Sequence, residues 1–139
     1  MLGYWNRPEA TAEAFDADGF FCTGDLGHVD EDGYLYIVDR LKDLIIHGGY
    51  NVYPREVEEV LYAHPQVFEA AVIGAADEHY GQQVAAVVTP MPGAELTAEE
   101  IEAWCRQSLS AYKIPRIIRI VDGLPKGPTG KIRKRSIEL

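Results

Sequence analysis

The spacing of hydrophobic residues predicts a helix in the middle of the chain. Val57, Val60 and Leu61 lie at i, i+3 and i+4, the spacing that places side chains on one face of an α-helix. Pro54 suits the first turn of this helix, and Pro65 ends it. We therefore expect an amphipathic helix over 54–61 that buries one apolar face.

A second helix is predicted from its start signal. Thr97 and Glu100 have the spacing of a capping box, in which each residue's side chain bonds the backbone N–H of the other. We expect this helix to end before Lys113. Its apolar face is expected to contain Ile101, Trp104, Cys105 and Leu109.

Three short apolar runs predict strands. Residues 67–73 are almost continuously apolar, which favours a central place in a sheet, and residues 85–89 and 117–121 follow as further strands. A two-stranded ribbon is expected over 42–46 and the residues after Gly49, because a glycine pair separates two apolar runs. The order of elements predicts an α+β fold, a small mixed sheet flanked by helices and preceded by a β-hairpin ribbon.

The first part of the chain predicts that hairpin. A short helix is expected over 8–15, followed by strands over 20–26 and 34–38 around a turn at 30–33. Residues 34–38 are apolar on both alternating faces, so this strand is expected to be interior or to lie at an interface. Because an isolated hairpin is marginally stable in water, we expect residues 1–38 to be poorly ordered or to associate with another copy of the chain.

Composition limits the class of protein. The chain has 139 residues, of which 47% are hydrophobic, enough for one packed domain with or without an appendage. No apolar run approaches the roughly 20 residues that span a bilayer, and no secretory signal is visible, so we expect a cytoplasmic protein. Cys22 and Cys105 lie far apart in apolar patterns, and buried reduced thiols are favoured over a disulfide.

Charge is unevenly distributed along the chain. The net charge is −9, yet residues 111–139 carry eight Lys and Arg against Asp122 and Glu138, a net +6 that leaves −15 for the first 110 residues. A basic end can bind nucleic acid, form a solvated face or meet an anionic small molecule. No aromatic residue lies among the cations of residues 126–135, as base stacking would require. We therefore favour an anionic small molecule and expect no nucleic acid partner.

Three motifs, taken together, resemble a known family. They are FCTGDL at 21–26, GYLYIVDRLKDLIIHGGYNVYPREVEE at 33–59 and LPKGPTGKI at 124–132. In this order they resemble the adenylate-forming enzymes, the superfamily of acyl-CoA synthetases, firefly luciferases and the adenylation domains of peptide synthetases. The resemblance implies that residues 1–38 are the tail end of the family's large adenylating domain and residues 39–139 its C-terminal lid domain. The start of the chain then looks like a cut within a longer protein.

The resemblance implies that Lys131 is the catalytic lysine of adenylation. That reaction brings a carboxylate next to the α-phosphate of ATP, and a compact ammonium on a flexible stem can bridge the crowded oxygens in the transition state. Residues 127–130 are rich in Gly and Pro, so we expect a loop that projects the lysine. A Gly-Lys pair alone usually means an exposed loop lysine, but the surrounding motif favours the catalytic interpretation. Gly127 stands where relatives often carry Thr or Ser.

Further residues match the family's nucleotide site and hinge. Asp25 matches an aspartate that accepts hydrogen bonds from the ribose hydroxyls, Arg40 an arginine near the same ribose and phosphate, and Lys42 a lysine that contacts the adenylate. Asp39 matches the hinge about which the small domain rotates. Without the resemblance, Asp25 is interpreted as a turn residue, and Arg40 and Lys42 as surface charges.

Gly48, Gly49 and Tyr50 match the face that serves thioester formation. Glycines without side chains open a passage for the pantetheine arm of coenzyme A, although an ordinary hairpin turn also explains the pair, and both can hold. Some relatives carry lysines near Ile46 and Gly48, whereas this chain has none there. Positioning of CoA is then left to the backbone and Tyr50. The GGYNVYPREVE run looks more like a CoA ligase than a peptide-synthetase adenylation domain.

The predicted function is the C-terminal lid domain of an ATP-dependent acyl-CoA synthetase of fatty acid metabolism. The full reaction converts a carboxylate, ATP and CoA to acyl-CoA, AMP and pyrophosphate, and the isolated chain is expected to be inactive without the large N-terminal adenylating domain. The four histidines show no metal-ligand spacing, so no metal site is predicted, and magnesium is expected to arrive with ATP on the large domain. The alternatives are a non-catalytic interaction module and a lid that complements a separate large domain in trans.

Overall fold

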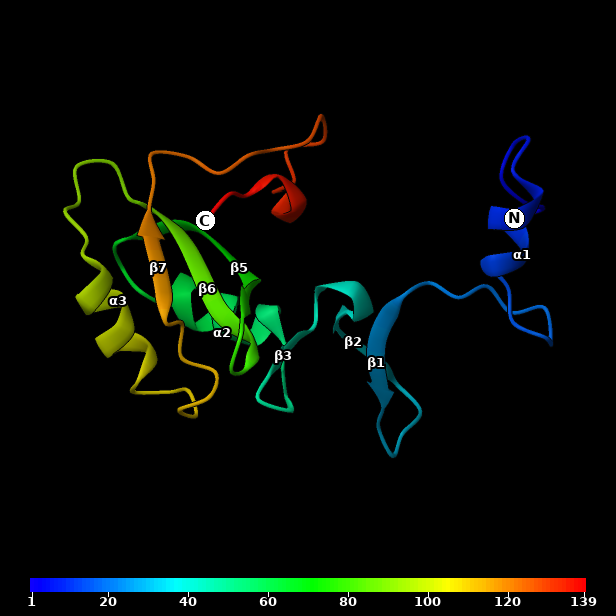
Figure 1. Ribbon diagram of the computed structural model, residues 1–139, viewed down its shortest axis with the longest axis horizontal. Helices are drawn as coiled ribbons and strands as arrows, with labels where there is room; N and C mark the ends of the chain where they lie inside the picture. Colours follow the sequence, from blue (N-terminus) through cyan, green and yellow to red (C-terminus); the bar gives the residue numbers. More distant parts are fainter. The chain divides into compact units, whose positions relative to one another are not determined.

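The computed structural model describes residues 1–139, which form two compact units, Met1–Lys42 and Asp43–Leu139 (Figure 1). The second unit holds a five-stranded mixed sheet with helices, and a hairpin precedes it, so the predicted α+β fold is confirmed. None of the helices has the length and apolar character that a membrane-spanning helix needs. The sequence placed the domain boundary after Val38, whereas the two compact units divide after Lys42.

The first unit contains one helix and one hairpin: α1 (Pro8–Glu13), β1 (Asp25–Val29) and β2 (Leu35–Arg40). Asp30 closes the turn, because its Oδ1 accepts the backbone N–H of Asp32 at 3.0 Å and of Tyr34 at 2.9 Å. The bond from Tyr34 is the main reason that the pKa of the Asp30 carboxyl lies below its ordinary value. Strand β1 begins later than predicted, while β2 continues through Asp39 and Arg40 because both residues pair with β1.

The side chains at the start of β2 are exposed. Tyr34, Leu35, Tyr36 and Ile37 have exposed fractions between 49% and 68%. The expectation of an interior strand is therefore wrong, because this sheet has two strands and nothing in the chain covers these side chains. The alternative, that an interface covers the strand, stays a prediction, as does self-association through residues 1–38.

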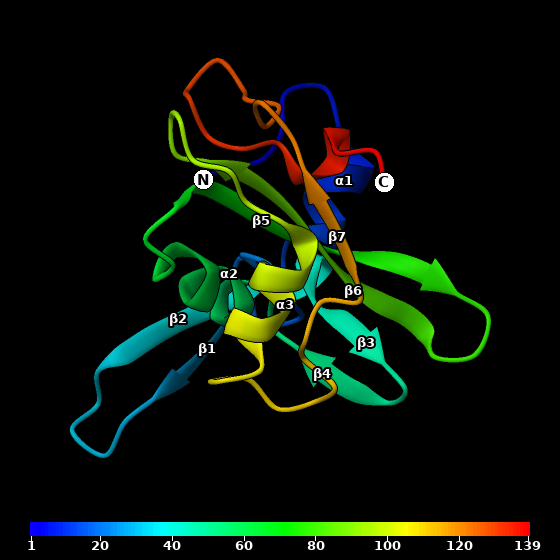
Figure 2. The same cartoon turned by 90° about the vertical axis from the view of Figure 1, so that its left-hand side faces the viewer.

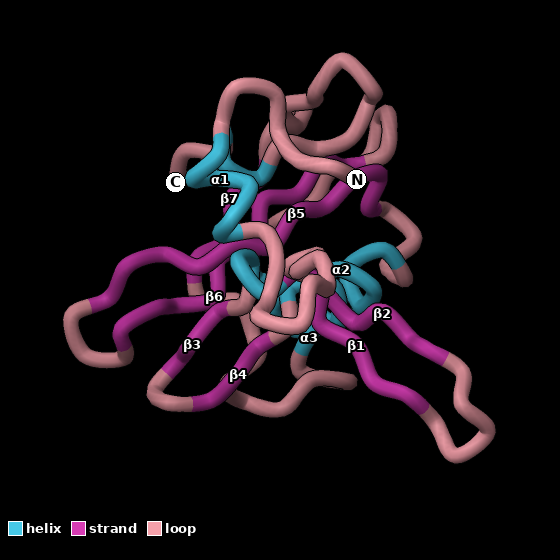
Figure 3. Tube along the Cα trace, turned by 90° about the vertical axis from the view of Figure 1, so that its right-hand side faces the viewer, coloured by secondary structure: helices cyan, strands magenta, loops and turns pink.

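In the second unit, β6 is the central strand. The elements after η1 (Leu41–Asp43) are β3 (Ile45–His47), β4 (Tyr50–Val52), α2 (Pro54–Tyr62), β5 (Val67–Asp77), β6 (Gly81–Pro90), α3 (Ala98–Cys105), β7 (Ile117–Ile120) and η2 (Lys134–Ser136). Antiparallel pairs give the order β4-β3-β6-β5, and β7 pairs with β6 in parallel; Figure 3 shows β3 and β4 following β6. Because β5 pairs with β6 alone, its predicted central position is wrong.

Side chains of helix α2 form hydrogen bonds with backbone groups of β5 that a neighbouring strand would otherwise bond. The Tyr62 hydroxyl donates to the carbonyl oxygen of Ala70 at 3.2 Å, and Glu58 Oε1 accepts the N–H of Val72 at 2.7 Å. Buried peptide groups need such partners. The apolar run of β5 therefore reflects burial of its two faces and not strands on both of its sides.

Alternating residues of β5 and β6 face two separate apolar cores. Helices α2 and α3 cover one face, which contains Val57, Leu61, Val72, Val84, Ala86, Val88 and Ile101 (Figure 2). The C-terminal segment, which we define as residues 124–139, covers the other face. That face contains Ala71, Val87, Leu124, Ile132, Ile137 and Leu139. Figure 1 shows α3 and the C-terminal segment on different sides of these strands.

The capping box predicted for the second helix is confirmed. Thr97 Oγ1 accepts the N–H of Glu100 at 3.3 Å, and Glu100 Oε2 accepts the N–H of Thr97 at 2.9 Å. The helix ends at Cys105, earlier than expected, because the N–H groups of Gln107 and Ser108 bond carbonyls three residues back, as in a tighter turn. Leu109 is nevertheless buried, so the apolar spacing continues beyond the helix itself.

The two cysteines differ in exposure. Both are free thiols, and Cys105 is buried as predicted. Cys22 is exposed, so the prediction of a buried thiol is wrong there. Its apolar neighbours Phe20 and Phe21 are themselves 72% and 45% exposed, and they form no core around it.

Candidate functional site

Lys131 lies in a short hairpin of the C-terminal segment. Lys126 and Ile132 form an antiparallel bridge, and the N–H of Gly127 donates to the carbonyl oxygen of Lys131 at 2.8 Å. Gly130 takes a φ of 78°, which the turn requires and which glycine adopts without strain. Lys131 itself is exposed and belongs to none of the ion pairs in the chain. Its ammonium group is therefore available to an anion from outside this unit.

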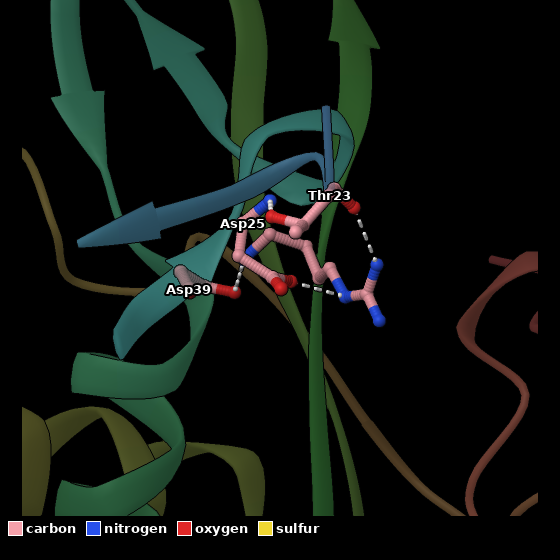
Figure 4. Close-up of polar contacts among 4 residues, drawn as sticks. Thr23, Asp25 and Asp39 are labelled. Atoms are coloured by element: carbon pink, nitrogen blue, oxygen red, sulfur yellow. Dashed lines mark hydrogen bonds and ion pairs between the residues drawn. The ribbon is translucent and has the colours of Figure 1, made fainter. Parts of the chain in front are cut away.

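Asp25 and Arg40 are brought together across the β1–β2 hairpin, where they form a register pair. Arg40 Nε lies 2.8 Å from Asp25 Oδ1, and Arg40 Nη1 donates to the carbonyl oxygen of Thr23 at 3.3 Å (Figure 4). Arg40, which without the resemblance is interpreted as a surface charge, thus forms its ion pair with Asp25. A carboxylate has about four acceptor positions, so Asp25 keeps capacity for further donors such as hydroxyls.

Asp39 and Lys42 lie near the end of the first unit. Asp39 is half-buried in β2, pairs with Leu26, and accepts the N–H of Arg40 through Oδ1 at 2.7 Å. The N–H of Leu41 still donates to the carbonyl oxygen of Gly24 at 2.9 Å, so hairpin bonding continues beyond Asp39. Lys42 is exposed in η1, where the two compact units divide. The hinge role of Asp39 stays a prediction.

Gly48 and Gly49 form the turn between β3 and β4. Their φ angles are 56° and 85°, the combination that a tight two-residue hairpin favours. A Cβ on Gly48 would lie 3.2 Å from the ring of Tyr80, whereas a Cβ on Gly49 would meet nothing within 4 Å. The N–H of Gly48 donates to the carbonyl oxygen of Tyr80 at 2.9 Å. The pair therefore forms an ordinary hairpin turn with open space on one side, and its role toward CoA stays a prediction.

Tyr50 belongs to an aromatic and charged group that sequence reasoning missed. Its ring, on a residue that is 61% exposed, stacks on Tyr112 with centroids 4.8 Å apart. Lys113 Nζ lies 5.6 Å from the Tyr112 centroid and bonds the Glu56 carboxylate at 2.6 and 2.8 Å. The bonds to Glu56 raise the pKa of Lys113. The available signal was the pair of Tyr112 and Lys113 at the beginning of the basic end, where the sequence predicted only that a helix ends.

The first unit contains a cavity that none of the predicted site residues line. Its volume is about 470 Å³, and it is lined by Tyr4, Arg7, Ala10, Glu13, Ala14 and Cys22. No group of three or more His, Cys, Asp or Glu side chains is arranged to hold a metal ion.

Residues 56–131 match the family model of the AMP-binding enzyme C-terminal domain. A feruloyl-CoA synthase of Amycolatopsis sp is 49% identical over 137 residues, which cover 99% of this chain and 28% of that protein. A long-chain-fatty-acid–CoA ligase of Mycobacterium tuberculosis is 50% identical over 131 residues, which cover 94% of this chain and 26% of that protein. The chain thus spans about a quarter of the length of these curated relatives.

Solved structures of adenylate-forming enzymes are also similar to this chain. ATP-bound MatB from Rhodopseudomonas palustris matches 96% of this chain with a TM-score of 0.89 and 44% identity, over 26% of its own length. The o-succinylbenzoate CoA synthetase MenE from Bacillus subtilis, in complex with its acyl-adenylate intermediate, matches 98% with a TM-score of 0.89 and 40% identity, over 28% of its length. The chain therefore belongs to the family of AMP-binding enzyme C-terminal domains, the family of adenylate-forming enzymes that its three motifs indicated.

Proposed function

We propose that this chain is the C-terminal lid domain of an ATP-dependent acyl-CoA synthetase and that it supplies Lys131 to the adenylation step. The observation that carries the proposal is the exposure of Lys131, which has no ion-pair partner in the chain although its hairpin is attached to a folded sheet. The family match at 56–131 and the CoA ligases among the relatives support the same conclusion.

Lys131 acts in this proposal by electrostatics. In adenylation a carboxylate oxygen attacks the α-phosphorus of ATP, so that an acyl adenylate forms and pyrophosphate leaves. Both reactants are anions, and an ammonium that donates to their oxygens stabilises the transition state more than the separated reactants. Asp25 accepts the ribose hydroxyls, and Arg40 holds the Asp25 carboxylate in place through its 2.8 Å ion pair. Magnesium arrives with ATP and is held by the large domain.

Thioester formation uses a different part of the chain. The thiol of CoA attacks the acyl carbonyl and AMP leaves, while Gly48, Gly49 and Tyr50 line the passage of the pantetheine arm. The change of face requires rotation about the segment that begins at Asp39.

A grafted enzyme tests the proposal. This chain would replace the corresponding C-terminal region of the Amycolatopsis feruloyl-CoA synthase, to which it is 49% identical. ATP–pyrophosphate exchange with the acid substrate of that enzyme measures adenylation. We expect exchange in the graft, and a loss of about 100-fold or more in Lys131→Ala, the size of effect that removal of one transition-state donor has in other enzymes.

The control removes a different cation. Arg119 is exposed in β7, and Arg119→Ala should leave exchange unchanged. Equal exchange in the Lys131→Ala graft and the parent graft would refute the role of the lysine. A folded graft without any exchange would favour the non-catalytic interaction module. Mixing the chain with a lid-less large domain then measures complementation in trans.

A further inference from the structure

We propose that Glu58 is a positioning residue for Lys131, because it holds the C-terminal segment against the sheet through Lys134. Glu69 also positions Lys131, because it holds Lys126, which precedes Lys131 in the chain, whereas Lys134 follows it. The inference deepens the proposed function and rests on it, since it concerns how Lys131 is presented for adenylation.

Two ion pairs flank Lys131 along the chain. Lys126 Nζ lies 2.7 Å from Glu69 Oε1, and Lys134 Nζ lies 2.7 Å from Glu58 Oε1. The two carboxylates are well covered, with side-chain exposures of 19% for Glu69 and 15% for Glu58. Exposed ion pairs contribute little to stability, but water screens these carboxylates less. The hairpin is therefore tied to the sheet both before and after its lysine.

Glu58 is itself fixed to the backbone of the sheet. The same oxygen that contacts Lys134 also accepts the N–H of Val72 in β5, at 2.7 Å. A charge-assisted hydrogen bond of this kind is stronger than one between neutral groups. Movement of Lys134 away from the sheet would break its contact with an oxygen that β5 holds in place.

We call the residues around Lys126 and Lys134, which the two ion pairs hold, the two arms of the hairpin. Backbone hydrogen bonds connect these arms to Lys131. The N–H of Arg133 donates to the carbonyl oxygen of Pro125 at 2.8 Å, and the N–H of Gly127 donates to the carbonyl oxygen of Lys131 at 2.8 Å. Ile132 packs against the second core of the sheet. Lys131 makes no ion pair of its own, so the two arms set the position of its backbone while its side chain stays free to reach a ligand.

The apolar contacts of the C-terminal segment remain when an ion pair is removed. Ile132, Ile137 and Leu139 pack on the sheet independently of Glu58. Loss of the Glu58–Lys134 pair should therefore displace Lys131 without detaching the C-terminal segment from the sheet. Misplacement of a reacting group by about 1 Å can lower a rate by roughly 100-fold, so even a smaller displacement is measurable.

The first experiment compares two neighbouring glutamates in the grafted enzyme. Glu58→Gln keeps an oxygen for the N–H of Val72 but removes the charge that holds Lys134. Glu59→Gln is the matched control, because Glu59 pairs with Arg55 at 3.3 Å on the exposed side of the same helix, with side-chain exposures of 69% and 59%. We expect Glu58→Gln and Lys134→Met to lower the kcat of adenylation about tenfold, because the displacement should be smaller than the shift of about 1 Å that lowers a rate by roughly 100-fold. Glu59→Gln should leave the kcat unchanged.

The second half-reaction separates positioning from general loss of structure. Thioester formation from preformed acyl adenylate and CoA does not use Lys131 in the proposed mechanism, so Glu58→Gln should leave its rate unchanged. An equal decrease of both half-reactions would overturn the positioning role. For the other arm, Glu69→Lys and Lys126→Glu should each slow adenylation, and the double charge reversal should restore it. A double variant no better than the singles would contradict the role of that pair.

Hydrogen exchange in the 139-residue chain tests the anchoring without any enzyme assay. In Glu58→Gln the bonded N–H groups of Gly127 and Arg133 should exchange faster, while those of α3 exchange as in the parent chain. Unchanged exchange at both N–H groups would overturn the inference. If Lys131→Ala retains adenylation, the proposed function fails while this measurement still decides the anchoring. If Lys131→Ala is inactive but Glu58→Gln equals Glu59→Gln in adenylation, only the inference fails.

Discussion

The two apolar faces of the sheet can be compared by making the same truncation in each. Leu61 in α2 is 0% exposed and packs among residues that are buried as completely, including Val52 and Val57. Leu124 is 7% exposed and packs against Ala71 and Val87, while the other members of its cluster are only partly buried. Leu61→Ala and Leu124→Ala remove the same atoms, so a difference in their effect reports on their surroundings.

The surroundings predict a larger effect at Leu61. Leu→Ala in a core lowers the free energy of unfolding by about 2–5 kcal/mol, of which transfer of the side chain accounts for a constant part and the residual cavity for the rest. Leu61 has fully buried neighbours that cannot close the cavity, so we expect about 4 kcal/mol. The partly exposed neighbours of Leu124 can move inward, so we expect about 2 kcal/mol there.

Trp104 provides the signal for this comparison. Its indole Nε1 donates to the carbonyl oxygen of Val60 in α2 at 2.8 Å, so its fluorescence reports the packing of α3 on α2. The only other tryptophan is Trp5, which is 96% exposed, and Trp5→Phe removes its background. Urea unfolding then gives both free energies, provided that the slope with denaturant is the same for each variant. A loss for Leu124→Ala as large as for Leu61→Ala would refute the reasoning, because it would mean that both faces are packed equally tightly.

Two further predictions concern titrating groups. In the native chain one thiol, Cys22, should react rapidly with a thiol reagent and Cys105 only on unfolding, because burial raises the pKa of Cys105 to about 11; two fast thiols would contradict this. Glu100→Gln should weaken the loss of stability in acid. Bonds from Thr97 lower the pKa of Glu100 below its ordinary 4.5, so its contribution is present above that value and is lost as pH falls through the folded pKa. Urea midpoints between about pH 6 and pH 3 should therefore decline less in Glu100→Gln than in the parent, and parallel declines would argue against it.

The sequence predicted best those features whose hydrogen bonds are local. The capping box at Thr97, the helix start at Pro54 and the glycine turn at Gly48 each depend on residues within one turn of the chain. The place of β5 at the sheet edge could not be predicted in this way. Its apolar run looks the same whether a strand or the side chains of α2 satisfy its free backbone groups, and that choice depends on tertiary packing.

The features of the candidate site also divide into those that the sequence predicted and those that depend on tertiary packing. Motifs named Asp25, Arg40 and Lys131, and the structure adds the geometry, including the 2.8 Å pair between the first two. The partners of the C-terminal segment had no signal in the sequence, because Glu58 and Lys134 are far apart in the chain and a lysine among several cations does not indicate which carboxylate it meets. Exposure also escaped prediction, since an apolar run such as residues 34–38 does not reveal whether its own chain can cover it.

The way in which β5 ends the sheet has a consequence for solubility. An exposed strand edge offers free N–H and C=O groups to any other extended chain, which makes it a starting point for intermolecular β-pairing and aggregation. Here the bonds from Tyr62 to Ala70 and from Val72 to Glu58 occupy two of those groups. Helix α2 thus protects the edge of β5 against strand addition. Loss of the Tyr62 or Glu58 side chain would favour association of the folded protein with itself.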